Sequence, residues 1–204
     1  MSTLKLYSGR RSPNARKVRL LAKELDLPLE IVNPDFAKGE LRSEEFLAIN
    51  PNGKVPVLDD DGFHLWESCA ILRYLAEKRP EKNLIPTDAK KRAAMDQWLF
   101  WWAAHCEPAL LTLVFERLVK PFLKLGEADA ALVSAAETEL NRYLPILDKQ
   151  LADRDHIAGA LSIADFAVAP WFESASAVGV SLDNYPNVAR WLKTLQSRPY
   201  WSDA

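Results

Sequence analysis

A proline stands at the start of an expected strand in NPNGKVPVL, residues 50–58. Because proline has no N–H to donate to a strand ladder, it is confined to strand starts, edges and bulges. A cis Val55–Pro56 peptide bond would let the strand begin here and would turn the N–H and C=O of Val55 away from the sheet. These groups could then pair with an extended peptide ligand, as an added strand does. A trans proline at a strand edge is the ordinary alternative, and the dipeptide alone leaves both open.

The segments around this proline predict one α/β domain over residues 1–80. Short apolar runs predict strands at residues 4–7, 29–33, 55–58 and 63–66, the last two joined by the acidic turn DDDG. Helical patterns begin at Pro13, Ser43 and Glu67. The first two strands, joined through a helix, should be parallel with a right-handed connection. This βαβαββα order, with a proline opening the third strand, is typical of a thioredoxin-like domain with a mixed four-stranded sheet.

The rest of the chain predicts an all-helical domain over residues 88–204. Residues 81–87 are polar and contain Pro86, so they are interpreted as a linker. Helical periodicity then recurs at residues 89–119, 127–151, 162–178 and 186–196. Ser162 and Asp165 have the Ser-x-x-Asp form of an N-terminal capping box. These two residues are expected to stabilise a helix and to take no part in chemistry.

The composition argues against several classes of function. The 26 basic and 28 acidic residues leave a formal charge of -2, so neither nucleic acid nor an anionic membrane is an expected partner. No uninterrupted apolar run of membrane-spanning length and no signal-peptide pattern occurs, which favours a soluble cytoplasmic protein. Cys69 and Cys106 match no disulfide framework or zinc spacing, and the histidines lie too far apart to suggest a metal site.

Two junctions between a strand and a helix carry polar residues suited to an anion. Ser12 precedes Pro13 at the first of them, where unpaired N–H groups and the helix dipole give positive potential. At the second junction, Ser68 could donate to a carboxylate while Glu67 pairs with an ammonium group, as at the α-amino acid end of a ligand. A simple helix cap explains each junction equally well when it is taken alone.

Taken together, three motifs followed by a helical domain resemble the cytosolic glutathione S-transferases, and the serine-type (phi- and theta-like) classes most closely. The motifs are SPNARKV, NPNGKVPVL and ESCAILRYLAEK, and the resemblance covers nearly the whole chain. It implies an enzyme that activates the thiolate of glutathione for attack on small apolar electrophiles, with peroxidase activity as a further reaction. It also implies a homodimer that takes glutathione as a substrate and uses no metal.

The resemblance assigns a role to each matching residue. Ser12 would donate a hydrogen bond to the glutathione sulfur. Val55, with Pro56 beside it, would pair with the cysteinyl backbone of glutathione, and Glu67 and Ser68 would hold its γ-glutamyl end. A hydroxyl donor and the positive end of a helix both favour the charged sulfur, which agrees with this assignment.

Other positions depart from the family pattern or compete with it. Lys54 would approach the peptide, and Arg42 would replace the lysine that phi-like relatives use for the glycyl carboxylate. Leu41 stands where those relatives often carry a histidine, which puts that contact in doubt. Tyr7 and Ser8 are rivals for the role of thiol partner, because other classes use a tyrosine near the end of the first strand.

The aromatic run DQWLFWWAAHCEPALL, residues 96–111, is apolar on more than one side of a helix. Helical spacing places Trp98, Trp102, His105 and Ala109 on one face. One side of this helix could line a cleft for an apolar electrophile or a subunit interface, while core packing explains most of the rings. Arg11 joins Trp102 and His105 as a predicted electrophile contact. Asp96 would reach a ligand across a dimer interface, as an acidic residue on this helix does in some relatives.

Two other functions stay open at this point. The same fold serves proteins that bind glutathione without turnover, because fold does not fix function. A glutathione-dependent disulfide oxidoreductase is the second, although no cysteine stands at the position of Ser12.

Overall fold

The computed structural model describes residues 4–36 and 38–203 of the chain. Contacts divide it into two compact units, which we call the first unit (Met1–Ile85 with Pro199–Ala204) and the second unit (Pro86–Arg198). The boundaries predicted from the sequence, at residues 80 and 88, stay a prediction. The last residues group with the first unit, where Arg16 Nη2 donates to the carbonyl oxygen of Trp201 at 2.8 Å and Tyr200 donates to Glu24.

The first unit contains a mixed sheet with the strand order β2-β1-β3-β4. Its elements are β1 (Leu4–Tyr7), α1 (Pro13–Glu24), β2 (Leu29–Val32), η1 (Glu40–Arg42), α2 (Glu44–Ile49), β3 (Val57–Asp60), β4 (Phe63–Trp66), α3 (Ser68–Glu77) and η2 (Pro80–Lys82). β1 is parallel to β2 and antiparallel to β3, and β3 is antiparallel to β4. This arrangement confirms the predicted four-stranded sheet and the thioredoxin-like order of elements.

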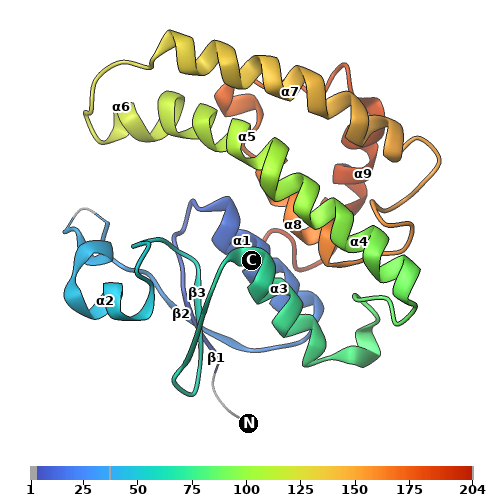
Figure 1. The fold of residues 1–204 in the computed structure, drawn as a ribbon, viewed down its shortest axis with the longest axis horizontal. Helices are drawn as coiled ribbons and strands as arrows, with labels where there is room; N and C mark the ends of the chain where they lie inside the picture. The colour runs from blue at the N-terminus through green and yellow to red at the C-terminus, as the bar shows by residue number, and fades with distance from the viewer. Residues whose placement is uncertain (1–3, 37, 204) are drawn as a thin grey trace. The chain divides into compact units, whose positions relative to one another are not determined.

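Helices cover both faces of this sheet (Figure 1). α1 and α3 pack side by side. Their apolar faces are buried and include Val18, Leu21 and Leu72. α2 lies on the other side of the strands, where Phe46 contacts the ring of Tyr7 edge-on with centroids 5.9 Å apart. Because side chains alternate along a strand, Tyr7 faces α2 while the neighbouring Leu6 is buried on the opposite face.

The second unit consists mostly of helices, as predicted. Its elements are α4 (Ala89–Trp101), η3 (Trp102–Cys106), α5 (Glu107–Val114), η4 (Phe115–Val119), α6 (Lys120–Phe122), α7 (Ala130–Gln150), α8 (Ile163–Phe172), η5 (Ser176–Val178) and α9 (Pro186–Gln196). All ten residues of α8 are buried, and the predicted capping box at its start is present, with Ser162 and Asp165 bonded reciprocally. The core of this unit therefore forms around α8.

Two stretches of the run from α4 to α6, η3 and η4, have π-helical geometry. A π-helix bonds i to i+5, so each residue turns the chain less than in an α-helix and the side-chain positions drift around the axis. The predicted shared face is therefore not continuous: Trp102 and Ala109 are buried, whereas His105 is exposed.

A cluster on the first unit predicts a change in alkaline stability. Lys78 Nζ donates to Asp60 Oδ2 at 2.5 Å, and Tyr74 Oη donates to the same oxygen at 2.6 Å. The hydrogen bond to Asp60 raises the pKa of Lys78 above its ordinary value of 10.5, and the same carboxylate raises the pKa of Tyr74. A pKa raised by folding adds stability below the unfolded pKa, and that stability is lost as the pH rises through the folded pKa.

Lys78→Met is therefore expected to lower the free energy of unfolding by about 0.2–1 kcal/mol at neutral pH, since this pair is partly screened by solvent. It should also make the loss of stability above about pH 10 shallower than in the parent. Urea unfolding at a series of pH values measures both effects. Lys23→Met, at an exposed position on α1, is the matched control. Equal alkaline losses in Lys78→Met and the parent would contradict the prediction.

Candidate functional site

The sheet register brings the predicted residues to one edge of the sheet. Tyr7 pairs with Val57, and Val57 pairs with Trp66, so these three residues form a row across β1, β3 and β4. The loop that leads to α1, the Val55–Pro56 bond and the junction with α3 all lie just beyond this row. Residues from distant parts of the sequence therefore meet at the N-terminal ends of α1 and α3.

Ser12 occupies the cap position of α1. Its backbone is extended, and its Oγ accepts a hydrogen bond from the N–H of Ala15 at 3.2 Å. Pro13 follows as the first helical residue, which the sequence predicted. Since a serine hydroxyl can accept and donate at once, this cap leaves the proton of Ser12 available for a partner outside the helix.

The two rivals of Ser12 have other surroundings. Ser8 is fully buried, and its Oγ accepts from Nη1 of Arg19 at 2.6 Å. The ring of Tyr7 packs against Phe46 on the α2 side of the sheet. Ser12 is thus the one among these three candidates that caps a helix.

Gly9 lies in the loop before Ser12 and has little free space around it, which was not predicted from the sequence. A Cβ atom at this position would lie 2.9 Å from Cζ of Phe36 and 3.3 Å from Cβ of Ser12. A side chain at Gly9 would therefore require the half-exposed ring of Phe36 to move. A lone glycine between a strand and a helix gives a weak signal in a sequence, because many loops contain one.

The Val55–Pro56 peptide bond is cis, one of the two forms that the sequence left open. β3 begins at Val57, two residues later than predicted, because Pro56 has no N–H to contribute to the ladder. Within residues 4–36 and 38–203, the backbone N–H and C=O of Val55 form no hydrogen bond. An extended peptide could pair with both groups.

Asn50 fixes the turn that precedes this bond. Its buried side-chain amide donates to the carbonyl oxygen of Lys54 at 2.7 Å, and its Oδ1 accepts from the backbone N–H of Asn52 at 3.0 Å. No role was predicted for Asn50 from the sequence. The asparagine at the first position was the available signal, because asparagine side chains often bond to the backbone two residues on.

Arg42 lies against the same turn. Gly53 has a positive φ of 59°, and a Cβ atom there would lie 2.8 Å from both Nη1 of Arg42 and the carbonyl oxygen of Leu41. The exposed side chain of Lys54 follows directly in the chain. Arg42 thus lies against Gly53, and Lys54 stands between Gly53 and Val55 in the chain, so two cations border this turn, where a carboxylate group on a ligand would be attracted.

The junction between β4 and α3 combines a strained backbone with a buried hydroxyl. Glu67 has φ 71° and ψ 109°, which is unusual for a residue with a side chain and costs on the order of 1–3 kcal/mol. Ser68, the first residue of α3, donates its hydroxyl proton to Oδ1 of Asn14 at 3.2 Å and accepts from Nζ of Lys17 at 3.3 Å. Glu67 is exposed and Ser68 is buried. Glu67 therefore offers a carboxylate acceptor at the surface, and Ser68 offers a hydroxyl donor in the interior.

The residues predicted to contact an electrophile lie in different surroundings. Arg11 is exposed in the loop before α1. Trp102 packs in the core of the second unit, with its ring 5.7 Å from that of Phe172. His105 lines a shallow cavity of about 340 Å³ between α5 and α7, and its ring lies 5.3 Å from that of Tyr143. The structure therefore does not bring Trp102 and His105 to one surface.

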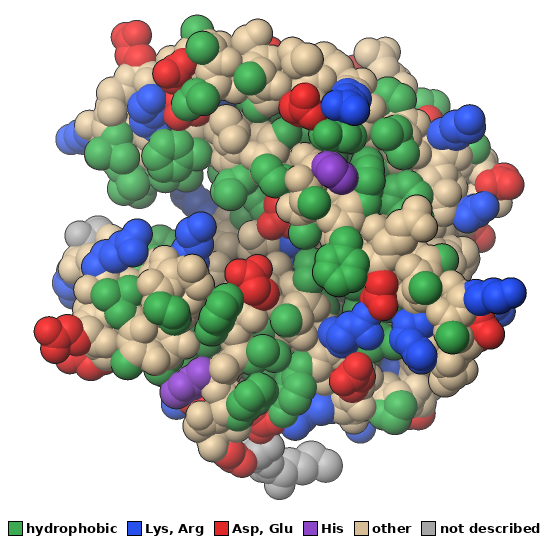
Figure 2. All heavy atoms as spheres, in the orientation of Figure 1, with side chains coloured by type: hydrophobic (Ala, Val, Ile, Leu, Met, Phe, Trp, Pro, Cys, Tyr) green, Lys and Arg blue, Asp and Glu red, His purple; other side chains and the backbone are tan. Residues whose placement is uncertain are grey.

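Two further features of the second unit concern contacts with other molecules. Asp96 is half-buried on α4. Hydrophobic side chains gather near α6 on the face drawn in Figure 2. In the chain from η4 to just beyond α6, five hydrophobic residues have exposed fractions between 38% and 75%: Phe115, Leu118, Phe122, Leu123 and Leu125. Such a patch is suited to an apolar ligand or a protein partner.

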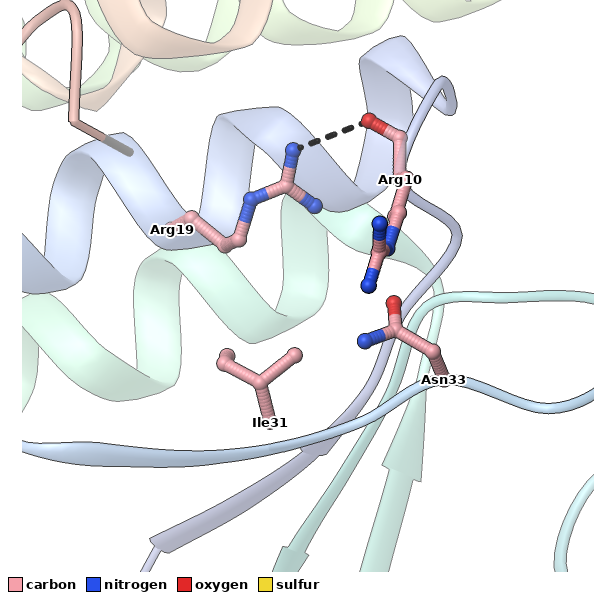
Figure 3. Close-up of a pocket in the computed structure, with 4 residues that line it drawn as sticks. All are labelled: Arg10, Arg19, Ile31 and Asn33. Carbon is pink, nitrogen blue, oxygen red and sulfur yellow. Dashed lines mark hydrogen bonds between the residues drawn. The ribbon is translucent and has the colours of Figure 1, made fainter.

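A hollow in the first unit lies beside the loop that leads to Ser12. Arg10, Arg19, Ile31 and Asn33 surround about 230 Å³, and Nη2 of Arg19 donates to the carbonyl oxygen of Arg10 at 3.5 Å (Figure 3). None of the residues predicted to bind glutathione lines this hollow.

Among the described residues, no group of three or more histidine, cysteine or acidic side chains is arranged to hold a metal ion. A membrane-spanning helix is likewise not found in the described part of the chain, since its helices are too short or too polar. Burial in an apolar environment raises the pKa of the Cys106 thiol, so this cysteine is a packing residue.

Comparisons with known proteins agree with this geometry. The N-terminal and C-terminal domain models of the glutathione S-transferases match residues 2–77 and 105–199. The chain is 37% identical over 207 residues to the glutathione S-transferase hmp2 of Hypomyces subiculosus, an alignment that covers 98% of this chain and 97% of that protein.

Two solved structures are similar to the whole chain. One is Ure2p in complex with glutathione, with a TM-score of 0.90, 27% identity and coverage of 100% of this chain and 98% of that one. The other is a glutathione S-transferase-I bound with lactoylglutathione, with a TM-score of 0.88, 31% identity and coverage of 99% and 98%. The sequence matches, the fold and the arrangement of residues at the sheet edge together establish that the chain belongs to the glutathione S-transferase family.

Proposed function

We propose that this glutathione transferase is of the serine type, with Ser12 as the donor to the glutathione sulfur. The observation that carries the proposal is the geometry of the cap, in which Ser12 Oγ accepts from Ala15 and its proton is left to donate elsewhere. A free thiol with a pKa near 8.5 is only a few per cent thiolate at neutral pH, and the thiolate is the nucleophile. A hydroxyl donor at a helix N-terminus stabilises that charge and lowers the pKa of the thiol.

Glutathione is proposed to bind along the edge of the sheet. Its cysteinyl backbone pairs with Val55, whose position is set by the cis bond to Pro56. Its γ-glutamyl end lies at the start of α3, where Glu67 accepts from the ammonium group and Ser68 donates to the carboxylate. The cations at Arg42 and Lys54 attract the glycyl carboxylate at the opposite end of the peptide.

In the proposed reaction, the thiolate sulfur forms a bond to an electrophilic carbon, and the leaving group departs with the bonding electron pair. In a second reaction, the same thiolate attacks the terminal oxygen of a hydroperoxide and the O–O bond breaks. This gives a sulfenic acid derivative of glutathione and an alkoxide, which takes a proton from water to become the alcohol. A small apolar electrophile is proposed, with Arg11 and His105 as contacts and Trp102 as the core residue behind η3. We further propose a cytoplasmic homodimer in which Asp96 reaches a ligand across the subunit interface.

Binding of glutathione without turnover is the second candidate. The similarity to Ure2p in complex with glutathione supports binding and does not by itself require catalysis. A glutathione-dependent disulfide oxidoreductase, acting through the thiolate of glutathione instead of a protein thiol, would use the same binding residues.

One set of assays separates these candidates. Calorimetry measures the affinity for glutathione, and initial rates are measured with chlorodinitrobenzene, a hydroperoxide and a mixed disulfide of glutathione. We expect binding, with conjugation of chlorodinitrobenzene. Binding with no turnover of any substrate would favour the binding protein, and turnover of the disulfide alone would favour the oxidoreductase. Failure to bind glutathione would overturn all three assignments.

A further inference from the structure

A lysine lies completely buried beneath the start of α3. Lys17, in the middle of α1, has a relative exposure of 0%, although lysine is almost never fully buried without a partner. The sequence alone places it in the basic segment RKVR, where a solvent-exposed position would be expected. Its described hydrogen bond runs from Nζ to Oγ of Ser68 at 3.3 Å. The ammonium group of Lys17 thus contacts Ser68, the residue proposed to hold the γ-glutamyl carboxylate.

The hydrogen bond from Lys17 determines where the hydroxyl proton of Ser68 can point. An ammonium group can only donate, so Ser68 Oγ accepts from Lys17, and its own proton must point to another acceptor. In this structure that acceptor is Oδ1 of Asn14, at 3.2 Å. A hydroxyl that accepts from a cation is polarised and becomes a better donor. Lys17 therefore prepares Ser68 to donate to a carboxylate.

We propose that Lys17 is a positioning residue for the γ-glutamyl carboxylate of glutathione. The inference rests on the proposed role of Ser68. When glutathione binds, the proton of Ser68 turns from Asn14 to the carboxylate while Lys17 keeps its bond to Oγ. The ammonium group also supplies positive charge in a buried place, where attraction to an anion is stronger than in water.

The test compares two peptides that differ only in this carboxylate. Calorimetry measures the affinity for glutathione and for an analogue with a γ-aminobutyryl group in place of the γ-glutamyl group. The parent should bind glutathione roughly ten- to a hundredfold more tightly than the analogue, as a charge-assisted hydrogen bond predicts. Lys17→Met should lose most of this preference, chiefly through weaker binding of glutathione, while Lys23→Met on the same helix should keep it.

A preference for glutathione that is unchanged in Lys17→Met would overturn the proposal, because a purely structural role would weaken both peptides alike. If Lys17→Met does not fold, Lys17→Arg and Lys17→Gln decide the question by the same ratio. The arginine variant, which keeps a cation, should retain more of the preference than the glutamine variant, and the reverse order would overturn the proposal. A parent that binds glutathione no more tightly than the analogue would count against Ser68 itself, and so against the proposed function.

Discussion

Replacing Ser12 by alanine is expected to lower the conjugation rate at about pH 6.5 by roughly 100-fold. The reason is the ionisation of the bound thiol: each unit by which its pKa rises toward the free value removes a factor of about ten in thiolate at low pH. The loss should shrink as the pH rises, because even an unassisted thiol becomes ionised above about pH 8.5. Initial rates with glutathione and chlorodinitrobenzene, across about pH 6 to 9, measure the effect.

Two variants separate the hydroxyl from the helix cap. Ser12→Ala also removes the bond to Ala15, which costs about 0.5–2 kcal/mol of stability. Ser12→Asp keeps a good cap, yet a carboxylate cannot donate to the sulfur and repels it, so this variant should be stable and inactive. Tyr7→Phe retains the contact with Phe46 and removes only a hydroxyl, so it should keep the parent rate. A large loss in Tyr7→Phe with none in Ser12→Ala would give the role to the tyrosine.

Replacing Asp165 by alanine is expected to lower the free energy of unfolding by about 3–5 kcal/mol. The carboxylate is fully buried and accepts from the backbone N–H groups of Ile157 and Ser162, each at 3.0 Å, and from Nε1 of Trp191 at 2.9 Å. Alanine would leave these donors without an acceptor in the core, and a buried network costs more to break than its separate bonds suggest. Urea unfolding followed by circular dichroism measures the loss.

Two controls bracket this effect. Ser162→Ala removes one cap of the same helix and should cost about 1 kcal/mol. Asp153→Ala changes a carboxylate that is 84% exposed, so the free energy of unfolding should move by less than about 0.5 kcal/mol. An Asp165→Ala variant as stable as Asp153→Ala would mean that the buried network contributes nothing to this unit.

The fold was largely predictable because its signals are local. Alternating and helical periodicities identify the elements, and Pro56 identifies where the third strand of the sheet can begin. The π-helical segments were not predictable, since an inserted residue leaves no mark in a continuous apolar run such as residues 96–111. This is why Trp102 and His105, expected on one face, lie in the core and at the surface.

The local backbone of the candidate site was predictable where a residue type has a strong structural preference, while the roles of its residues stay predictions. Ser12 before Pro13 indicates a helix start, and proline after Val55 indicates an interrupted ladder. The positive φ of Glu67 was beyond prediction, because glutamate carries no preference for that conformation. The burial of Lys17 was equally hidden, since it depends on how α1 packs against α3 and not on its neighbours in the sequence.

The pKa of the thiol in bound glutathione tests the central claim most directly. It is measured by the ultraviolet absorbance of the thiolate during a pH titration, with saturating glutathione, for the parent and for Ser12→Ala. We predict that the thiol bound to the parent ionises about two pH units below free glutathione, and that the variant returns most of the way to the free value. The same thiol pKa in both proteins would contradict the assignment of Ser12.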